Sequence, residues 1–137
     1  MSFLDRLKTL LRIPKDVSEA TELIYVKLPE PLEPFERGDR YGGPLDAELR
    51  LAGVGYVSGG GALLSAPNAD GSRTIEYCGV DVDALDVPRA LELLRRELPE
   101  LGCLSGTELQ YQLGAARLID RFTGTGWATA LPEEAPG

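Results

Sequence analysis

Two strand-like runs separated by turn-forming residues place the strongest constraint on the fold of this chain. Residues 53–58 (GVGYVS) and 74–82 (TIEYCGVDV) are typical of β-strands, and the second run is rich in β-branched and aromatic side chains. Between them lies GGGALLSAPNADGS, in which Asn68, Asp70 and Gly71 favour turns. The segment therefore predicts an antiparallel hairpin with an irregular tip, whose glycines allow bulges or positive φ angles.

A helix is predicted directly after this hairpin, over residues 87–98. Asp86 can cap its N-terminus and Pro88 suits its first turn, while the following apolar residues recur at helical spacing. Pro99 is expected to end or distort the helix, with Gly102 as a plausible cap residue.

Further elements are predicted on both sides of this unit. Residues 21–28 (TELIYVKL) and 107–113 (TELQYQL) are typical of strands, and residues 116–122 (ARLIDRF) fit either a strand or a short helix. Residues 29–44 hold four prolines and three glycines and are expected to form a long, extended loop. The short run 45–51 (LDAELRL) fits either a short helix or the lead into a strand.

The expected architecture is an α+β fold with a mainly antiparallel sheet of four or five strands. Helix 87–98 is expected to cover one face of this sheet, in a single domain that spans residues 16–130. Residues 1–15 are predicted to form a basic amphipathic helix, because apolar residues recur at helical spacing over 3–12. The tail 131–137 is expected to be flexible.

The charge is unevenly distributed. The net charge is −8, yet the first 15 residues hold four basic side chains and one acidic side chain, so the remainder of the chain carries −11. An acidic body repels nucleic-acid phosphates and attracts basic protein surfaces. The alternative interpretation is that the acidity only maintains solubility.

The residue types restrict the possible chemistry. The chain contains no histidine, which excludes the common histidine-dependent nucleophile arrangements and most zinc sites. Cys78 and Cys103 do not form a CxxC pair and are predicted to be buried thiols. The N-terminus lacks the features of a signal peptide, so a cytoplasmic location is predicted. No cofactor and no enzymatic activity are expected.

Two motifs in the central segment suggest ligand binding only weakly. The glycine-rich stretch superficially resembles a phosphate loop, but a phosphate loop requires a helix directly after it, and a strand is predicted here. Asp81 and Asp83 have the spacing of the paired aspartates of haloacid dehalogenase phosphatases, although no lysine follows Lys27. We interpret the aspartates as a solvated strand face, with a weak divalent-cation site as the alternative.

Several motifs together resemble a family of small, uncharacterised bacterial α+β proteins. The motifs are YGGPLDAEL, GVGYVSGGG, IEYCGVDVD, ALELLRREL and GTELQY, and they span roughly residues 24–113. The resemblance implies a glycine-rich hairpin, a strand ending in acids, a helix and a GT-led strand, together with a bacterial origin. It transfers no catalytic residue. In size, charge and architecture the chain is also similar to immunity proteins, which neutralise toxins.

The leading functional hypothesis is a non-enzymatic module that binds the basic surface of another protein, such as an immunity-type inhibitor of a basic toxin. One alternative is a peripheral membrane or assembly module that uses helix 3–12. A second alternative is a metal-assisted hydrolase centred on Asp81 and Asp83. The residues predicted to contact a protein partner are Phe35, Glu36, Asp39, Tyr41, Asp81 and Asp83.

Overall fold

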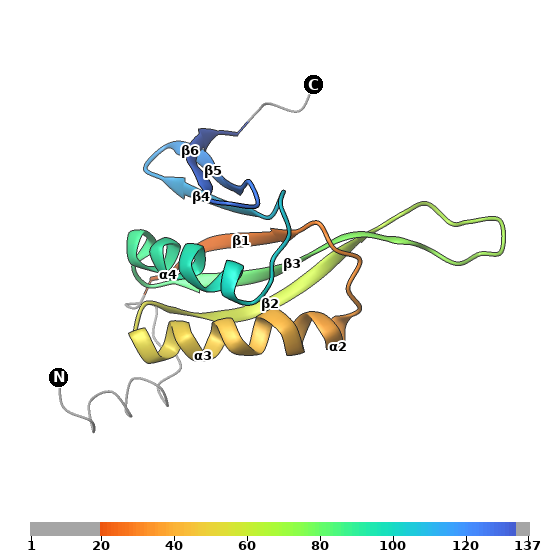
Figure 1. The fold of residues 1–137 in the computed structure, drawn as a ribbon, viewed down its shortest axis with the longest axis horizontal. Coiled ribbons are helices and arrows are strands. Elements are labelled where there is room, and N and C mark those ends of the chain that lie inside the picture. The colour runs from red at the N-terminus through yellow and green to blue at the C-terminus, as the bar shows by residue number, and fades with distance from the viewer. Residues whose placement is uncertain (1–19, 134–137) are drawn as a thin grey trace.

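The computed structural model describes residues 20–133, and the predicted helix 3–12 lies outside this range. Six strands and two helical regions make up the described chain (Figure 1). The strands are β1 (Glu22–Leu28), β2 (Gly55–Leu64), β3 (Ile75–Ala84), β4 (Glu108–Leu113), β5 (Ala116–Phe122) and β6 (Trp127–Pro132). The helical segments are α2 (Pro34–Arg37), the π-helix η1 (Gly38–Gly42), α3 (Gly43–Ala52) and α4 (Val87–Glu100).

The strands form one antiparallel sheet in the order β2-β3-β1-β4-β5-β6. Strand β1 lies in the middle, between β3 and β4, so the β3–α4–β4 unit spans it. The first four strands and the two helical regions thus have the split β-α-β arrangement of ferredoxin-like domains. Strands β5 and β6 extend the sheet beyond β4 as a meander. The α+β prediction is confirmed, but the sheet has six strands, because residues around Trp127 add a strand that the sequence did not indicate.

The predicted extended loop over 29–44 is wrong from residue 34 onward, since a continuous helical region begins at Pro34. Proline favours the first turn of a helix, where its missing N–H is not needed, and Pro34 occupies such a position, whereas Pro44 follows the π-helical turn η1 near the start of α3. Tyr41, Leu45 and Leu49 recur every four residues and are fully buried. This spacing indicates a helix, but the many prolines and glycines in the segment favoured the interpretation as a loop.

Both helical regions pack on the same face of the sheet. Their buried side chains form one core with the inward-facing residues of β1 and β3, including Ile24, Val26 and Val82. The predicted cap is confirmed, because the Asp86 carboxylate accepts a hydrogen bond from the Arg89 N–H at 3.1 Å. None of the helices between residues 20 and 133 is long and apolar enough to cross a membrane.

The hairpin of β2 and β3 is confirmed, and it is longer than predicted. Strand β2 continues through the three glycines to Leu64, because a register shift after Val57 lets the pairing with β3 resume at Gly59. Beyond the body of the domain the paired strands project as an arm that ends in an exposed turn (Figure 1). Gly71 has a φ of 85° in this turn, as glycine permits.

Candidate functional site

The face of the sheet opposite the two helices is the candidate site, and we call it the open face. It is formed by alternate residues of the central strands, since their neighbours in sequence point into the core. No helix or strand of the described chain covers it (Figure 1). Its central residues are Leu23, Tyr25 and Lys27 of β1, Tyr77, Asp81 and Asp83 of β3, and Gln110 of β4.

The strand register places the two aspartates beside β1. Asp83 stands opposite Leu23, and Asp81 stands opposite Tyr25. The Thr21 hydroxyl donates a hydrogen bond to Asp83 Oδ1 at 3.2 Å, and within residues 20–133 neither aspartate forms an ion pair. Leu23 of β1 lies beside the two aspartates, and it is 54% exposed. Two carboxylates that form no ion pair within the described part of the chain thus border an exposed apolar side chain.

Tyr25 occupies the centre of the open face. Its ring lies over Gly79, where a Cβ atom would clash with the ring, so this glycine is required by packing. Burial, followed by the neighbouring Tyr77 and Asp81, raises the pKa of Tyr25 above its ordinary value. The phenol therefore stays neutral and can both donate and accept a hydrogen bond at neutral pH.

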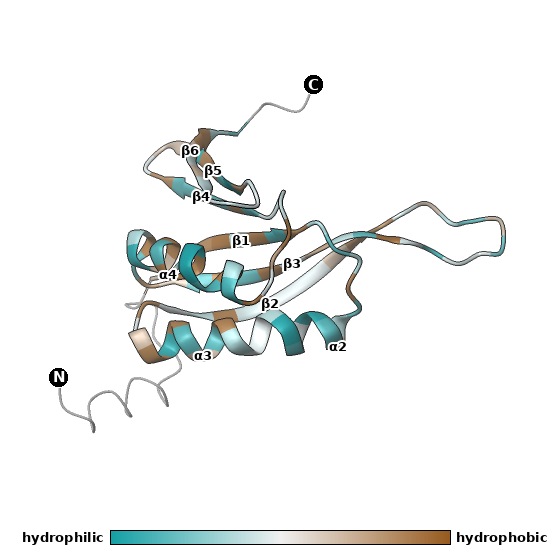
Figure 2. Ribbon diagram, in the orientation of Figure 1, coloured by the Kyte–Doolittle hydropathy of each residue, from teal (hydrophilic) through white to brown (hydrophobic). Residues whose placement is uncertain are grey.

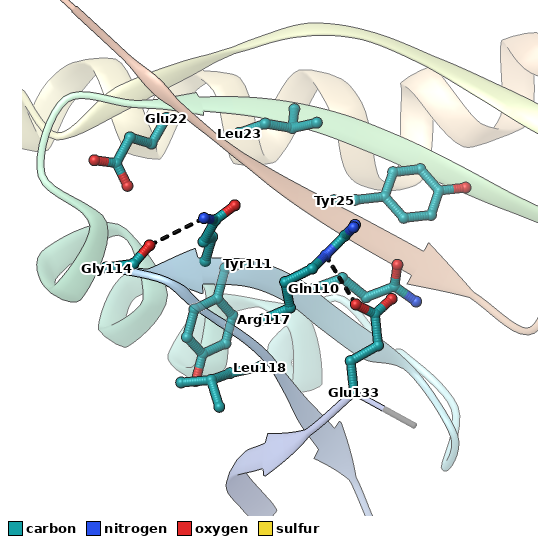
Figure 3. A pocket seen from close by; sticks show the side chains of 10 residues that line it. Glu22, Leu23, Tyr25, Gln110, Tyr111, Gly114, Arg117, Leu118 and Glu133 are labelled. Atoms are coloured by element: carbon teal, nitrogen blue, oxygen red, sulfur yellow. Dashed lines mark hydrogen bonds and ion pairs between the residues drawn. The ribbon is translucent and has the colours of Figure 1, made fainter. Parts of the chain in front are cut away.

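A hollow of about 500 Å³ adjoins Tyr25 on the side of β4 and β5 (Figure 3). Ligand pockets commonly measure ~300–1,000 Å³, so the hollow could accept one large side chain or a small molecule. Its lining combines apolar, amide, phenol and charged groups, including an ion pair of 2.9 Å between Arg117 and Glu133. The Gln112 amide donates to the Gly114 carbonyl at 3.0 Å. These groups can hydrogen-bond a ligand and orient it.

A second polar cluster connects α4 to the last three strands. Asp120 is fully buried, forms an ion pair with Arg95, and accepts hydrogen bonds from the Tyr111 hydroxyl and the Ala130 N–H, each at 2.7 Å. Burial, then the hydrogen bond to Asp120, raises the pKa of Tyr111 to about 12. Ala130 has a φ of 55°, a conformation that is uncommon for a residue other than glycine. Every member of this cluster is satisfied, so we assign it a structural role.

Trp127 completes the connection through the backbone of α4. Its indole N–H donates to the Arg95 carbonyl at 2.9 Å. That carbonyl would ordinarily accept from the N–H four residues later, which is position 99, and Pro99 has no N–H. The helix continues to Glu100 despite the proline, and Trp127 supplies the donor that Pro99 lacks. No local sequence pattern indicates that Trp127 lies beside Pro99, because the two residues belong to different elements.

The residues predicted to contact a partner do not lie on one surface. Phe35 is 84% exposed on α2, and Glu36 and Asp39 are also exposed on the helical side of the domain. Asp81 and Asp83 lie on the open face, on the other side of the sheet.

Tyr41 differs from the other predicted contact residues because its side chain is fully buried. Its hydroxyl donates to Glu30 Oε2 at 2.6 Å, and Arg40 pairs with the same carboxylate. Burial, followed by the hydrogen bond to Glu30, raises the pKa of Tyr41. The prediction of Tyr41 as a surface contact is therefore corrected: its aromatic ring belongs to the core, at the helical spacing described above.

The remaining reactive residue types are placed as follows. Cys78 and Cys103 are both buried and free, as predicted, and burial raises the pKa of each thiol. Between residues 20 and 133 no group of three or more histidine, cysteine, aspartate or glutamate side chains is arranged to hold a metal ion. Asp81 and Asp83 thus have no third acidic ligand beside them in this range.

Comparison of the chain with protein-family models, with curated proteins and with solved structures finds no match.

Proposed function

We propose that this chain is a non-enzymatic protein-binding module whose open face receives the basic surface of another protein. One observation carries the proposal: Asp81 and Asp83 lie unpaired within the described range beside the exposed Leu23 on an uncovered sheet face. Carboxylates that form no ion pair with any of the residues 20–133 favour association with lysine or arginine of another molecule. The net charge of −11 outside the first 15 residues also attracts a basic partner, and it does so over longer distances.

The geometry of the open face suggests how such a partner is held. A lysine or arginine of the partner reaches the two aspartates, while Leu23 and the ring of Tyr25 supply apolar contact. The adjoining hollow accepts one larger side chain, and its amide and phenol groups hydrogen-bond that side chain or its backbone. In its most specific form, the proposal is an immunity-type inhibitor that covers the basic surface of a toxin.

The test compares two charge-matched variants of the tagged full chain. Asp81→Asn with Asp83→Asn removes two negative charges from the open face, and Glu36→Gln with Asp39→Asn removes two from the helical side. Each protein is used to capture partners from a lysate of the source cells at low and high salt. A partner held through the open face is retained by the parent and the helical-side variant at low salt and lost at high salt.

The captured protein is then titrated by calorimetry. Loss of the two open-face carboxylates should weaken the complex by at least about tenfold, since each desolvated charge pair contributes on the order of 1 kcal/mol or more. Equal affinity for the parent and the open-face variant, or loss of binding only in the helical-side variant, would contradict the assignment. Capture of no protein at either salt concentration would contradict the binding function itself.

A further inference from the structure

The neighbouring strands β1 and β4 separate from each other along part of their length. Only residues 25–27 of β1 pair with residues 108–110 of β4, although both strands continue beyond this contact. The same register would place Leu23 opposite Gln112, but these two residues do not pair. The sheet therefore opens at this point, and Figure 1 shows β4 turned away from β1. We call this opening between the two strands the split.

The backbone N–H and C=O groups of Leu23 and Gln112 point into the split. The Thr107 carbonyl accepts a hydrogen bond from an N–H of β5, so the backbone of every second residue from Thr107 onward points toward β5. The backbone groups of the residues between them, including Gln110 and Gln112, point toward β1. Tyr25 and Gln110 are therefore a hydrogen-bonded pair, and Leu23, two residues before Tyr25, points its backbone groups the same way. Within residues 20–133 neither Leu23 nor Gln112 has a strand partner on this side.

The hollow of about 500 Å³ lies in this split. Leu23 and Tyr25 of β1 line one side of it, and Gln110 and Gln112 of β4 line the other (Figure 3). In Figure 2 most of β1 is coloured as hydrophobic, whereas β4 includes hydrophilic residues. Strand groups without partners beside such a space are suited to a short extended segment of another chain, because that segment supplies the missing N–H and C=O partners.

We propose that an extended segment of the protein partner inserts into the split as an additional strand and directs a lysine or arginine toward Asp83. This inference rests on the proposed function for the choice of a basic partner, and it adds how that partner is held. Consecutive residues of an extended segment direct their backbone groups to opposite sides. One residue of the segment therefore pairs with Leu23, and the next pairs with Gln112.

The surroundings of the split favour a basic residue in this segment. A residue that pairs with Leu23 places its side chain on the open face, because paired residues share a face of the sheet. Asp83 stands on the other side of Leu23, two strand spacings or about 10 Å from the inserted backbone. A lysine or arginine extends toward it with its apolar stem on the exposed Leu23. Arg117 also lines the hollow, but Glu133 pairs with it at 2.9 Å, and Glu22 adds a further negative charge.

The first measurement tests whether the split is open in the free protein. Amide hydrogen exchange of the full chain should show rapid exchange of the Leu23 and Gln112 amides and protection of the Tyr25 and Gln110 amides. Protection of both Leu23 and Gln112 would overturn the proposal, because the split would then be closed or already filled, for example by a terminal segment of this chain.

The second measurement selects binders from a display library of short random peptides on the full chain at low salt. We expect the selected peptides to contain lysine or arginine, and a synthetic copy of one is then titrated against two variants at one position. Gln112→Ala keeps the N–H that points into the split, and Gln112→Pro removes it. Proline is tolerated where a strand N–H has no partner, and circular dichroism checks that the variant is folded. Gln112→Ala should bind as the parent does, and Gln112→Pro should bind at least about tenfold more weakly.

Backbone N-methylation of the synthetic peptide tests the same hydrogen bonds without any change in the protein. Methylation of an amide that pairs with β1 or β4 should weaken binding to a similar extent. The proposal is overturned if no peptide is selected, if the selected peptides lack basic residues, or if neither Gln112→Pro nor any N-methylation weakens binding.

The inserted strand and the binding function can fail separately. A peptide that binds through the split, with no partner captured from the lysate, would contradict the proposed function alone. A captured partner that Gln112→Pro binds at full strength would contradict the inserted strand alone.

Discussion

The hydrogen bond between Trp127 and Arg95 provides a quantitative test of how the terminal strand is held. Replacing Trp127 by Phe keeps an aromatic ring in contact with Phe122, whose ring centroid lies 5.2 Å from that of the tryptophan, but removes the indole N–H. Because Pro99 cannot donate, the Arg95 carbonyl then loses its hydrogen-bond donor. Loss of this bond should cost about 1–2 kcal/mol of unfolding free energy, beyond any loss of packing.

A double-mutant cycle separates these two contributions. Pro99→Ala restores an N–H that can donate to the Arg95 carbonyl within the helix. In the Pro99→Ala background, Trp127→Phe therefore loses only its packing. The interaction energy between the two substitutions should be about 1 kcal/mol or more, with Trp127→Phe less destabilising when alanine occupies position 99.

The assay is urea unfolding followed by far-UV circular dichroism, since Trp127 is the only tryptophan and its fluorescence is absent in two of the four proteins. For a small domain, with a slope of ~1–3 kcal/mol/M, the coupling moves the transition midpoint by about 0.5 M. If Trp127→Phe costs the same free energy in both backgrounds, to within about 0.3 kcal/mol, Trp127 does not substitute for the missing helical donor.

Three further predictions concern buried tyrosines and a glycine. Tyr41→Phe removes a donor from the buried Glu30 and should lower the unfolding free energy by about 1.5–3 kcal/mol in urea titrations; an unchanged midpoint would contradict this. Gly79→Ala forces the Tyr25 ring to move and should lower the unfolding free energy by about 1–3 kcal/mol. If Gly79→Ala is equally destabilising in a Tyr25→Ala background, the clash with the ring is not the cause. The pKa of Tyr111 is raised from 10.0 to about 12, so its neutral form contributes stability that is complete below pH 10 and is lost as the pH rises toward 12. Tyr111→Phe should reduce this loss of stability between pH 10 and pH 12 in alkaline unfolding curves followed by phenolate absorbance. An identical pH dependence in the parent and in Tyr111→Phe would contradict the prediction.

Local patterns predicted much of the fold. The strands over 21–28 and 107–113 and the helix with its Asp86 cap were placed within about two residues, because alternation, helical spacing and capping act over a few neighbouring residues. The helical region over 34–44 was missed because its prolines and glycines were interpreted as breakers, while 45–51 was left open between a short helix and a strand. These prolines and glycines occupy positions that a helix tolerates. Only the burial of Tyr41 and Leu45 distinguishes a helix from an extended loop in this segment.

The candidate site was predicted in part. Asp81 and Asp83 were chosen from their alternation in a strand, and they do share one face. Their neighbours Leu23 and Tyr25 were not foreseen, since which strand lies beside β3 is decided by the sheet order. The separation of Phe35 from the aspartates has the same origin, because a sequence does not show on which side of a sheet a helix will pack.

The sequence by itself determined the hairpin, the capped helix, the acidic surface and the lack of histidine chemistry, since these depend on residue types and on spacings within a single element. The tertiary structure alone decided that β1 lies between β3 and β4 and that Asp120 forms an ion pair with Arg95. It also decided that Trp127 donates to the Arg95 carbonyl, to which Pro99 cannot donate. The physical reason is that these contacts join residues 25 or more positions apart. Their formation depends on burying one common core, and no local pattern along the chain encodes which distant partners that core brings together.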